Sequence, residues 1–451
     1  MYPIFGIFFT KSYQYIVLEG KNLWIKRFLC SILGIMKKIL LFILFFLLPF
    51  VIFTADLSDF YSSFTSLSSL PFFSDKNTGL TIFPTLLIPM GGLYEGMGTA
   101  YTAVSSDSGF IESNPAGSAL LNYTELTLNH NNWIADTNIE GLVYTTRFNN
   151  LGIGIGGKFL YVPFIGYNRW GEEEASGYYS ETIATMNLSY NFFSSYYFYG
   201  LSVGTNIKAA YRHTPEAIYA DKSVGNQSAA SIMADIGVIS RFNFLKFYTA
   251  RERNFSLGAV VKNLGPTVLD EPLPSIITGG ISYAPIRPLL ISFDYNYPFS
   301  LSQTNSEWEK WNIAVGINGT LTDFFSIHAG FSHRGSNPKF TIGSGLILEK
   351  INLNINYTLD MTTQLAAIDK FSIEATLPLG DKGRKVNSRK VDEYYIAGLE
   401  SYAKGDLTKA ISFWDEALKI DPQFQPASEN MAIVKAAIEL QKTMEALNVV
   451  E

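Results

Sequence analysis

The chain has 451 residues, more than one ordinary domain requires, and its formal net charge is −6. It is 47% hydrophobic and 15% aromatic but only 16% charged, whereas about a quarter of a typical soluble protein is charged. This composition suits a surface that faces lipid. The acidic balance argues against a nucleic-acid-binding protein, which would carry a basic face.

The N-terminal region has the pattern of an export signal. Met36-Lys37-Lys38 is followed by an unbroken apolar run from Ile39 to Phe53 and then by Thr54-Ala55-Asp56. A charged start, a short apolar run and a small-residue end are typical of a secretory signal, and the run is shorter than the roughly 20 residues of a spanning helix. We therefore expect a leader over residues 1–55, cleaved after Ala55.

Residues 1–35 add a second apolar and basic segment, for which two explanations stay open. Translation starts at Met36, or residues 1–35 belong to an uncleaved helical hairpin in the inner membrane. The only cysteine, Cys30, lies here, and we expect it to be removed with the leader. The mature chain would then have no disulfide framework and no thiolate metal site.

The segment that follows the leader, residues 56–120, is predicted to be an N-terminal plug inside a barrel. From Gly91 onward it is rich in glycine, alanine and serine and nearly uncharged, and it begins as a helix. Small residues suit a segment that packs closely against a wall. The plug motif ends the helix and turns the chain towards the first strand; its residues are Gly96, Met97, Gly98, Asn114, Pro115, Ala116 and Gly117.

Residues 121–380 alternate apolar and polar side chains with a period of two. From Ile351 to Asp360, for example, each large apolar residue is followed by Asn, Thr or Asp. Successive side chains of a strand point to opposite faces, so such strands have one apolar and one polar face. The strands are about ten residues long and aromatic residues gather at their ends, as expected of a tilted membrane strand and of interfacial aromatic girdles.

We predict about fourteen antiparallel strands in a closed transmembrane barrel, because an open edge in lipid would leave backbone groups unpaired. Asn149-Asn150 marks a tight turn. The long polar segments 163–180 and 213–229 are expected to be extracellular loops. The strands are predicted near 123–132, 138–148, 151–162, 181–192, 200–212, 230–243, 254–262, 276–285, 288–297, 310–319, 323–333, 338–347, 350–359 and 368–378.

The period changes in the C-terminal part. Residues 381–390 form a charged linker, and residues 391–451 are predicted to be a small α-helical module. Small residues let two antiparallel helices approach, and a proline ends the second helix, at the spacing of a tetratricopeptide repeat. The repeat motif consists of Gly398, Ala410, Trp414, Ala417 and Pro422. A docking module for a periplasmic protein and a passive helical cap both fit this pattern.

Chemical motifs are weak throughout the chain. The glycine-rich run 152–157 lies within a strand with no helix after it, so a thin barrel wall is favoured over a dinucleotide site. His328 and His333 are five residues apart on one strand and face opposite sides, so they cannot share a metal ion. A lumenal hydrolase centred on His328 is a minor alternative, since no nucleophile elbow is present. We predict that the protein is not an enzyme and needs neither cofactor nor metal.

The polar face of the strands gives the candidate contacts for a substrate. A mutually paired, solvated interior is the favoured interpretation, because barrel interiors are usually polar. The functional alternative is that a cation meets an anionic head group while apolar plug residues contact a hydrophobic tail. The candidates are Met97, Phe110, Lys158, Lys208, Arg212 and His328, from a polar face that also carries Asp235, Lys262, Asp294, Asp360 and Glu374.

Several stretches resemble a known group of membrane barrels. The run GMGTAYTAV (96–104) with NPAG (114–117) resembles the N-terminal plug of the long-chain fatty acid transporter superfamily and the related PorV/PorQ barrels. An uncharacterised spirochaete (treponemal) branch is most similar, through NTGLTIFPTLLIPMGG (77–92), SNPAGSALL (113–121), TELTLNHNNWIADTNIEGLVYTTR (124–147) and GYYSET (177–182). The resemblance covers residues 77–380 and implies a fourteen-stranded, plugged barrel that passes hydrophobic molecules.

The chain departs from this group at its C-terminus, where a helical tail follows the last strand instead of a terminal aromatic residue. The resemblance favours an outer-membrane transporter for fatty acids or similar molecules, in contact with outer-membrane lipid and with its module in the periplasm. PorV-like relatives keep a second hypothesis open, in which the barrel is a scaffold that recruits secretion or envelope proteins through residues 391–451. No nucleic-acid partner is expected.

Overall fold

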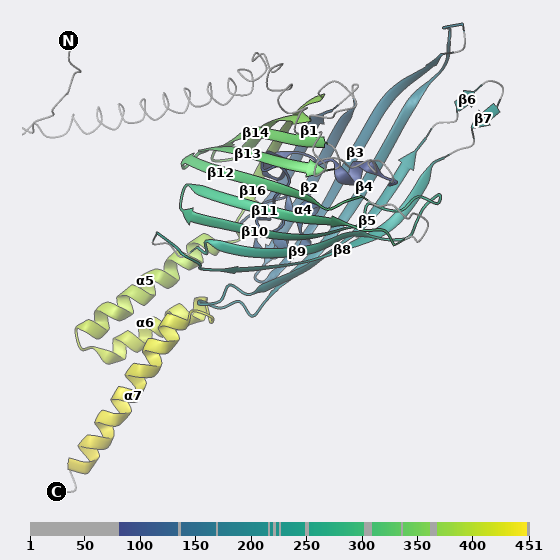
Figure 1. Ribbon diagram of the computed structural model, residues 1–451. Helices are drawn as coiled ribbons and strands as arrows, with labels where there is room; N and C mark the ends of the chain where they lie inside the picture. Colours follow the sequence, from purple (N-terminus) through teal and green to yellow (C-terminus); the bar gives the residue numbers. More distant parts are fainter. Residues whose placement is uncertain are drawn as a thin grey trace, which may run out of the picture.

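Fourteen antiparallel strands close into a barrel in this computed structural model, and a helical module follows the last strand (Figure 1). The structure describes residues 81–448 except 134–136, 168–169, 215–216, 220–221, 225–226, 249–251, 302–308, 335–336 and 361–367. The expected leader, the alternative start at Met36 and the first part of the plug lie outside the described residues. The predicted fold class is confirmed.

Each barrel strand pairs with its neighbour in the sequence, and β16 pairs with β1 to close the ring. The barrel strands are β1 (Thr124–Asn132), β2 (Asn138–Phe148), β3 (Leu151–Tyr167), β4 (Glu173–Phe192), β5 (Leu201–His213), β8 (Ala229–Phe242), β9 (Phe255–Leu264), β10 (Ile276–Ile286), β11 (Leu289–Pro298), β12 (Asn312–Thr322), β13 (Phe325–Arg334), β14 (Asn337–Ile347), β15 (Asn352–Asp360) and β16 (Ile368–Gly380).

The burial pattern of the strands is the reverse of that in a soluble sandwich. In β5, Ser202, Asn206 and Lys208 are buried inside the barrel, whereas Ile207 and Tyr211 are exposed on its outside. Large exposed apolar side chains occur in the same way on β2, β3, β4, β8 and β10. A strand with polar residues inside and apolar residues outside is suited to a lipid surround.

Two of the predicted connections are wrong in extent. Residues 163–167 and 173–180, expected in an extracellular loop, continue β3 and β4, which are 17 and 20 residues long. Within 213–229, β6 (Ala217–Tyr219) and β7 (Lys222–Val224) form a separate two-stranded sheet between β5 and β8. The predicted turn at Asn149-Asn150 is confirmed, because it joins β2 to β3 and Asn149 has a φ of 51°.

A compact segment, residues 81–121, lies inside the barrel; it is called the inner segment below. It consists of η2 (Pro84–Leu87), α3 (Gly92–Gly96), α4 (Phe110–Ser113) and η3 (Pro115–Leu120). α3 contacts β13 to β16, whereas η3 contacts β2 to β5 and β8. The inner segment therefore touches opposite walls of the ring, in agreement with the small residues that it carries.

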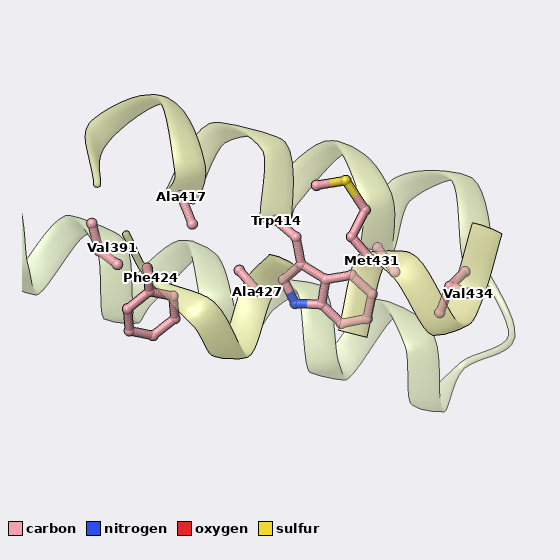
Figure 2. Close-up of a cluster of buried hydrophobic side chains, with 8 residues drawn as sticks. Val391, Trp414, Ala417, Phe424, Ala427, Met431 and Val434 are labelled. Carbon is pink, nitrogen blue, oxygen red and sulfur yellow. The ribbon is translucent and has the colours of Figure 1, made fainter. Parts of the chain in front are cut away.

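The helical module consists of α5 (Arg384–Ala403), α6 (Leu407–Ile420) and α7 (Gln425–Asn448). Its core gathers around Trp414, which is almost fully buried, and includes Ala410 and Ala417 (Figure 2). A Cβ atom at Gly398 would overlap the Trp414 ring, so the glycine lets α5 and α6 approach. Pro422 lies in the turn after α6. The tetratricopeptide assignment itself stays a prediction.

The expected linker 381–390 is helical from Arg384 onward, which corrects the prediction. At the start of α5, the Asp381 carboxylate accepts from the Gly383 and Lys385 nitrogens. The Arg384 guanidinium donates to the backbone oxygens of Asn122 and Arg147 on the barrel rim. No helix in the described parts of the chain has the length and apolar character that a membrane crossing requires.

The module is also attached to the barrel at the connection between β4 and β5. The ring of Tyr196 lies 5.2 Å from that of Phe424, edge to face. The Tyr197 hydroxyl donates to Glu429 at 3.0 Å, and Arg253 donates to the backbone oxygens of Tyr196 and Tyr197 at 2.8 Å. These contacts hold the module in one orientation relative to the barrel.

Candidate functional site: the barrel interior and its inner segment

The Gly-Met-Gly part of the plug motif lies directly on the barrel wall. Gly98 has a φ of 61°, and a Cβ atom added there would be 2.6 Å from the backbone nitrogen of Phe331. A Cβ atom at Gly330 in β13 would overlap the backbone of Met97 and Gly98. Glycine is therefore required at Gly98 in the motif and at Gly330 in β13, because the two backbones lie in direct contact there.

Asn114 joins the second part of the motif to the opposite wall. Its side-chain oxygen accepts from the Ala116 nitrogen at 3.2 Å and so caps η3. Its amide nitrogen lies 3.0 Å from the Thr102 oxygen, 3.1 Å from the Val238 oxygen and 3.4 Å from the Ala259 oxygen. One buried side chain thus connects two parts of the inner segment to β8 and β9.

Wall side chains bind the backbone on both sides of Asn114. Ser202 donates to the Ala116 oxygen at 2.6 Å, and Asn187 donates to the Pro115 oxygen at 2.9 Å. Asn206 donates to the Ile111 oxygen at 3.0 Å. Because buried backbone oxygens need partners, these polar wall residues stabilise the seat of the inner segment.

The three inward glycines of the run 152–157 also serve this seat. A Cβ atom at Gly152, Gly154 or Gly156 would meet Ser118, Phe110 or Ile111 of the inner segment. The interpretation of this run as a thin wall, and not a dinucleotide site, agrees with these contacts and with its position in β3.

Two carboxylates of the inner segment form buried ion pairs with the wall. Glu112 lies 2.6 Å from the Lys158 ammonium, and its other oxygen accepts from the Met90 nitrogen at 2.9 Å. Glu95 lies 2.8 Å from the Lys370 ammonium. Neither acid stands out in a segment whose composition is nearly uncharged. The missed signal was an acidic residue inside an otherwise apolar, glycine-rich segment, which needs a cation once it is buried.

A cavity of about 330 Å³ lies between the inner segment and the wall. One part of its lining is apolar and comes from residues 84–90 of the inner segment together with wall residues such as Ile183 and Ile276. The charged lining residues are Glu95, Glu112, Lys158, Lys208, Lys262, Asp294, Glu309, Arg334, Lys339, Asp360 and Lys370. The cavity is therefore amphipathic.

Most cations of this cavity are already paired. Lys208 lies 2.6 Å from Asp235, Lys339 lies 2.6 Å from Asp360, and Arg334 makes a two-pronged contact with Glu309. Asp294 accepts from the Tyr101 and Thr102 nitrogens. Among the described residues, Lys262 has no carboxylate partner within 4 Å, and its nearest hydrogen-bond acceptor is the Glu112 backbone oxygen at 3.4 Å.

The structure places the six candidate contacts in different surroundings. Lys158 and Lys208 line the cavity, but each is ion-paired. Met97 and Phe110 are fully buried in apolar clusters and are not among the lining residues, so they pack the inner segment. Arg212 lies near the end of β5, with Glu271 at 3.9 Å.

His328, the sixth candidate, is buried under Gly96 of the inner segment. Its Nε2 atom lies 2.7 Å from the Asn356 side-chain oxygen. This contact gives the ring a structural partner, and the partner is an amide, which is not a nucleophile. Within the described residues, no cluster of three or more His, Cys, Asp or Glu residues could hold a metal ion.

An open groove of about 610 Å³ lies on the outer side of the wall, over β1 to β4 and β16. Its lining includes exposed Leu128, Leu142 and Phe159, and it shares Gly157 and Lys158 with the inner cavity. A Cβ atom at Gly157 would meet nothing within 4 Å. The groove and the cavity therefore lie against the same two residues of β3, on opposite sides of the wall.

Several solved structures are similar to this chain. The toluene transporter TodX of P. putida covers 65% of this chain and all of its own length, with 11% identity and a TM-score of 0.43. CdiB from Acinetobacter baumannii covers 56% of this chain and 59% of its own length, with 9% identity and a TM-score of 0.36.

Sequence relatives occur in Treponema pallidum (strain Nichols), where they are described as UPF0164 proteins. One is 27% identical over 392 residues, which is 83% of this chain and 87% of the relative. Another is 23% identical over 380 residues, 79% of this chain and 76% of the relative. The model of the uncharacterised protein family UPF0164 matches residues 58–382. The chain therefore belongs to the UPF0164 family.

Proposed function

We propose that the protein is an outer-membrane barrel that transports hydrophobic molecules carrying an acidic group, such as long-chain fatty acids, without covalent chemistry. The observation that supports this proposal is the amphipathic cavity. Apolar residues 84–90 lie on one side of it, and Lys262 supplies a cation that has no described carboxylate partner within 4 Å. Such a lining can hold an apolar chain and bind a carboxylate at its end.

In this proposal the inner segment acts as a plug. It occupies the barrel between opposite walls, so a substrate in the cavity passes only when part of the segment moves. The reversed burial pattern of the strands supports insertion in a membrane, and the long β3 and β4 extend on the side away from the helical module. We accordingly assign the module to the periplasm.

Binding of labelled oleate to the folded full-length protein tests the proposal. We expect saturable binding, weakened about tenfold by Lys262→Met, because a hydrogen bond to a charged group contributes about 1.5–3 kcal/mol. A neutral alkane of similar length should bind the variant and the parent equally. Lys246→Met, which removes a lysine next to the Tyr248 ring and outside the cavity, is the matched control. Absence of saturable oleate binding to the parent protein would contradict the proposal.

A further inference from the structure

The last helix of the module, α7, carries an apolar stripe that nothing in the described structure covers. Ile433, Leu440 and Met444 are 63%, 64% and 56% exposed, and Ala437 is exposed between them. Their spacing of four, three and four residues is that of a coiled-coil seam. The four residues are called the α7 seam.

The α7 seam is separate from the face that holds α7 in the module. Met431 and Val434 pack into the core around Trp414, and Ile438 packs against it (Figure 2). With 3.6 residues per turn, the α7 seam lies about 120° around the helix from this packed face. The seam is therefore free in the folded module, and no rearrangement is needed to use it.

Between Ile433 and Met444, the positions that flank the α7 seam are uncharged. The flanking positions are Ala436, Gln441 and Thr443, whereas Lys435, Glu439 and Lys442 lie on the opposite side of the helix. In coiled coils the flanking positions select partners by opposite charge. Uncharged flanks permit two identical helices to pair without like-charge repulsion, and they offer no charge pattern for a different partner to read.

The attachment of the module fixes how two copies would meet. Contacts of Arg384, Tyr196 and Tyr197 hold the module on the barrel rim, and the C-terminal half of α7 extends beyond the α5–α6 pair (Figure 1). Two barrels in one membrane can be related by a two-fold axis along the membrane normal, which brings the same face of α7 together in parallel. Such a contact is isologous and closed.

We propose that the α7 seam pairs two copies of this chain, as a short parallel coiled coil on the periplasmic side. This inference does not depend on which substrate the barrel passes. It assigns a role to the exposed apolar residues of α7 that packing of the module leaves unexplained.

Disulfide cross-linking of the full-length protein in its membrane tests the pairing. The starting variant is Cys30→Ser, because Cys30 is the only cysteine. After mild oxidation, Leu440→Cys in this background should give a covalent dimer of the chain. Glu439→Cys, one residue away and on the opposite side of α7, is the matched control and should give little or none. Equal yields from the two variants, or no dimer from Leu440→Cys, would overturn the proposal.

A second variant tests whether the seam drives the contact. With Ala437→Cys as the reporter, Leu440→Glu should lower the dimer yield about tenfold or more, because it places like charges in the apolar contact. Lys442→Glu, on the opposite side, should leave the yield unchanged. The helical signal in circular dichroism checks that both variants keep the module folded. A cross-linked product of a different mass, containing another protein, would show that the seam serves a different partner.

Discussion

At the scale of single residues, the barrel interior is organised by buried charges that come in pairs. Lys158 belongs to the wall and Glu112 to the inner segment, so their ion pair joins two parts of the chain. Removing one member of a buried pair leaves an uncompensated charge, whereas removing both members is often tolerated. This difference makes the pair testable.

Glu112→Gln should lower the free energy of unfolding by about 3–5 kcal/mol, because Lys158 then lacks its counter-charge. The double variant Glu112→Gln, Lys158→Met should recover most of this loss. Thermal or urea unfolding of the refolded barrel, followed by the shift of its band on unheated gels, measures both. A double variant less stable than Glu112→Gln alone would show that the charges act independently.

Asn114→Ala removes the cap of η3 and the contacts to the Thr102, Val238 and Ala259 oxygens. We expect the seat of the inner segment to be destabilised by about 1–3 kcal/mol, the cost of leaving buried polar groups unpaired. If the segment is a plug that must move, flux of labelled oleate into liposomes should rise. Unchanged flux with a folded barrel would mean that this part of the segment never moves during transport. Asn352→Ala, at the start of β15, is the control.

At the scale of elements, β3 is distinctive because one face seats the inner segment and the other lines the outer groove. Gly157→Leu should fold normally, because its Cβ atom has open space, and the new side chain should fill the groove. If substrate leaves sideways through the wall beside Gly157, oleate flux should fall several-fold. Gly279→Leu has the same open space on β10 and should not change flux. Equal flux in both variants would exclude this route.

The strands were largely predictable because their side chains alternate between an apolar outer face and a polar inner face. The ends of β3 and β4 were not. Residues 163–167 (PFIGY) and 173–180 (EEASGYYS) do not alternate regularly between apolar and polar side chains, so the period of two no longer marks them as strands. The early start of α5 was missed because residues 384–390 are mostly charged or polar and carry no apolar period, although Asp381 accepts from the Lys385 nitrogen at the start of the helix.

Close packing at the plug motif was predictable from the sequence, because Gly96, Gly98 and Gly117 have no side chains and let another segment approach. The partners of Glu95 and Glu112 were not predictable. Lys370 and Lys158 become partners only when strands far along the chain close around the segment. Lys262 was one of several inward lysines in the sequence, and only the pairing of the others distinguishes it.

At the scale of the whole molecule, barrel and helical module are joined but closure of the barrel does not require the module. The pairing of β1 with β16 runs from Thr124–Gly380 to Asn132–Phe371 and is complete before α5 begins. Removal of residues 384–451 should therefore leave a closed barrel. Circular dichroism should show an unchanged β-sheet signal, and the gel shift on heating should persist. Failure of this truncated chain to form a barrel would show that the module is needed for assembly.

The inner segment also has a consequence for the order of folding. η3 touches β2 to β5 and β8, which follow it closely in the chain, whereas α3 touches β13 to β16, the last strands to be made. Contacts of η3 can thus form while the sheet is still open, but α3 cannot reach its wall until the final strands arrive. The Glu95–Lys370 pair in particular needs β16, the strand that also closes the ring by joining β1. The first half of the barrel can be built around one end of the inner segment, and the other end is enclosed only when the ring shuts.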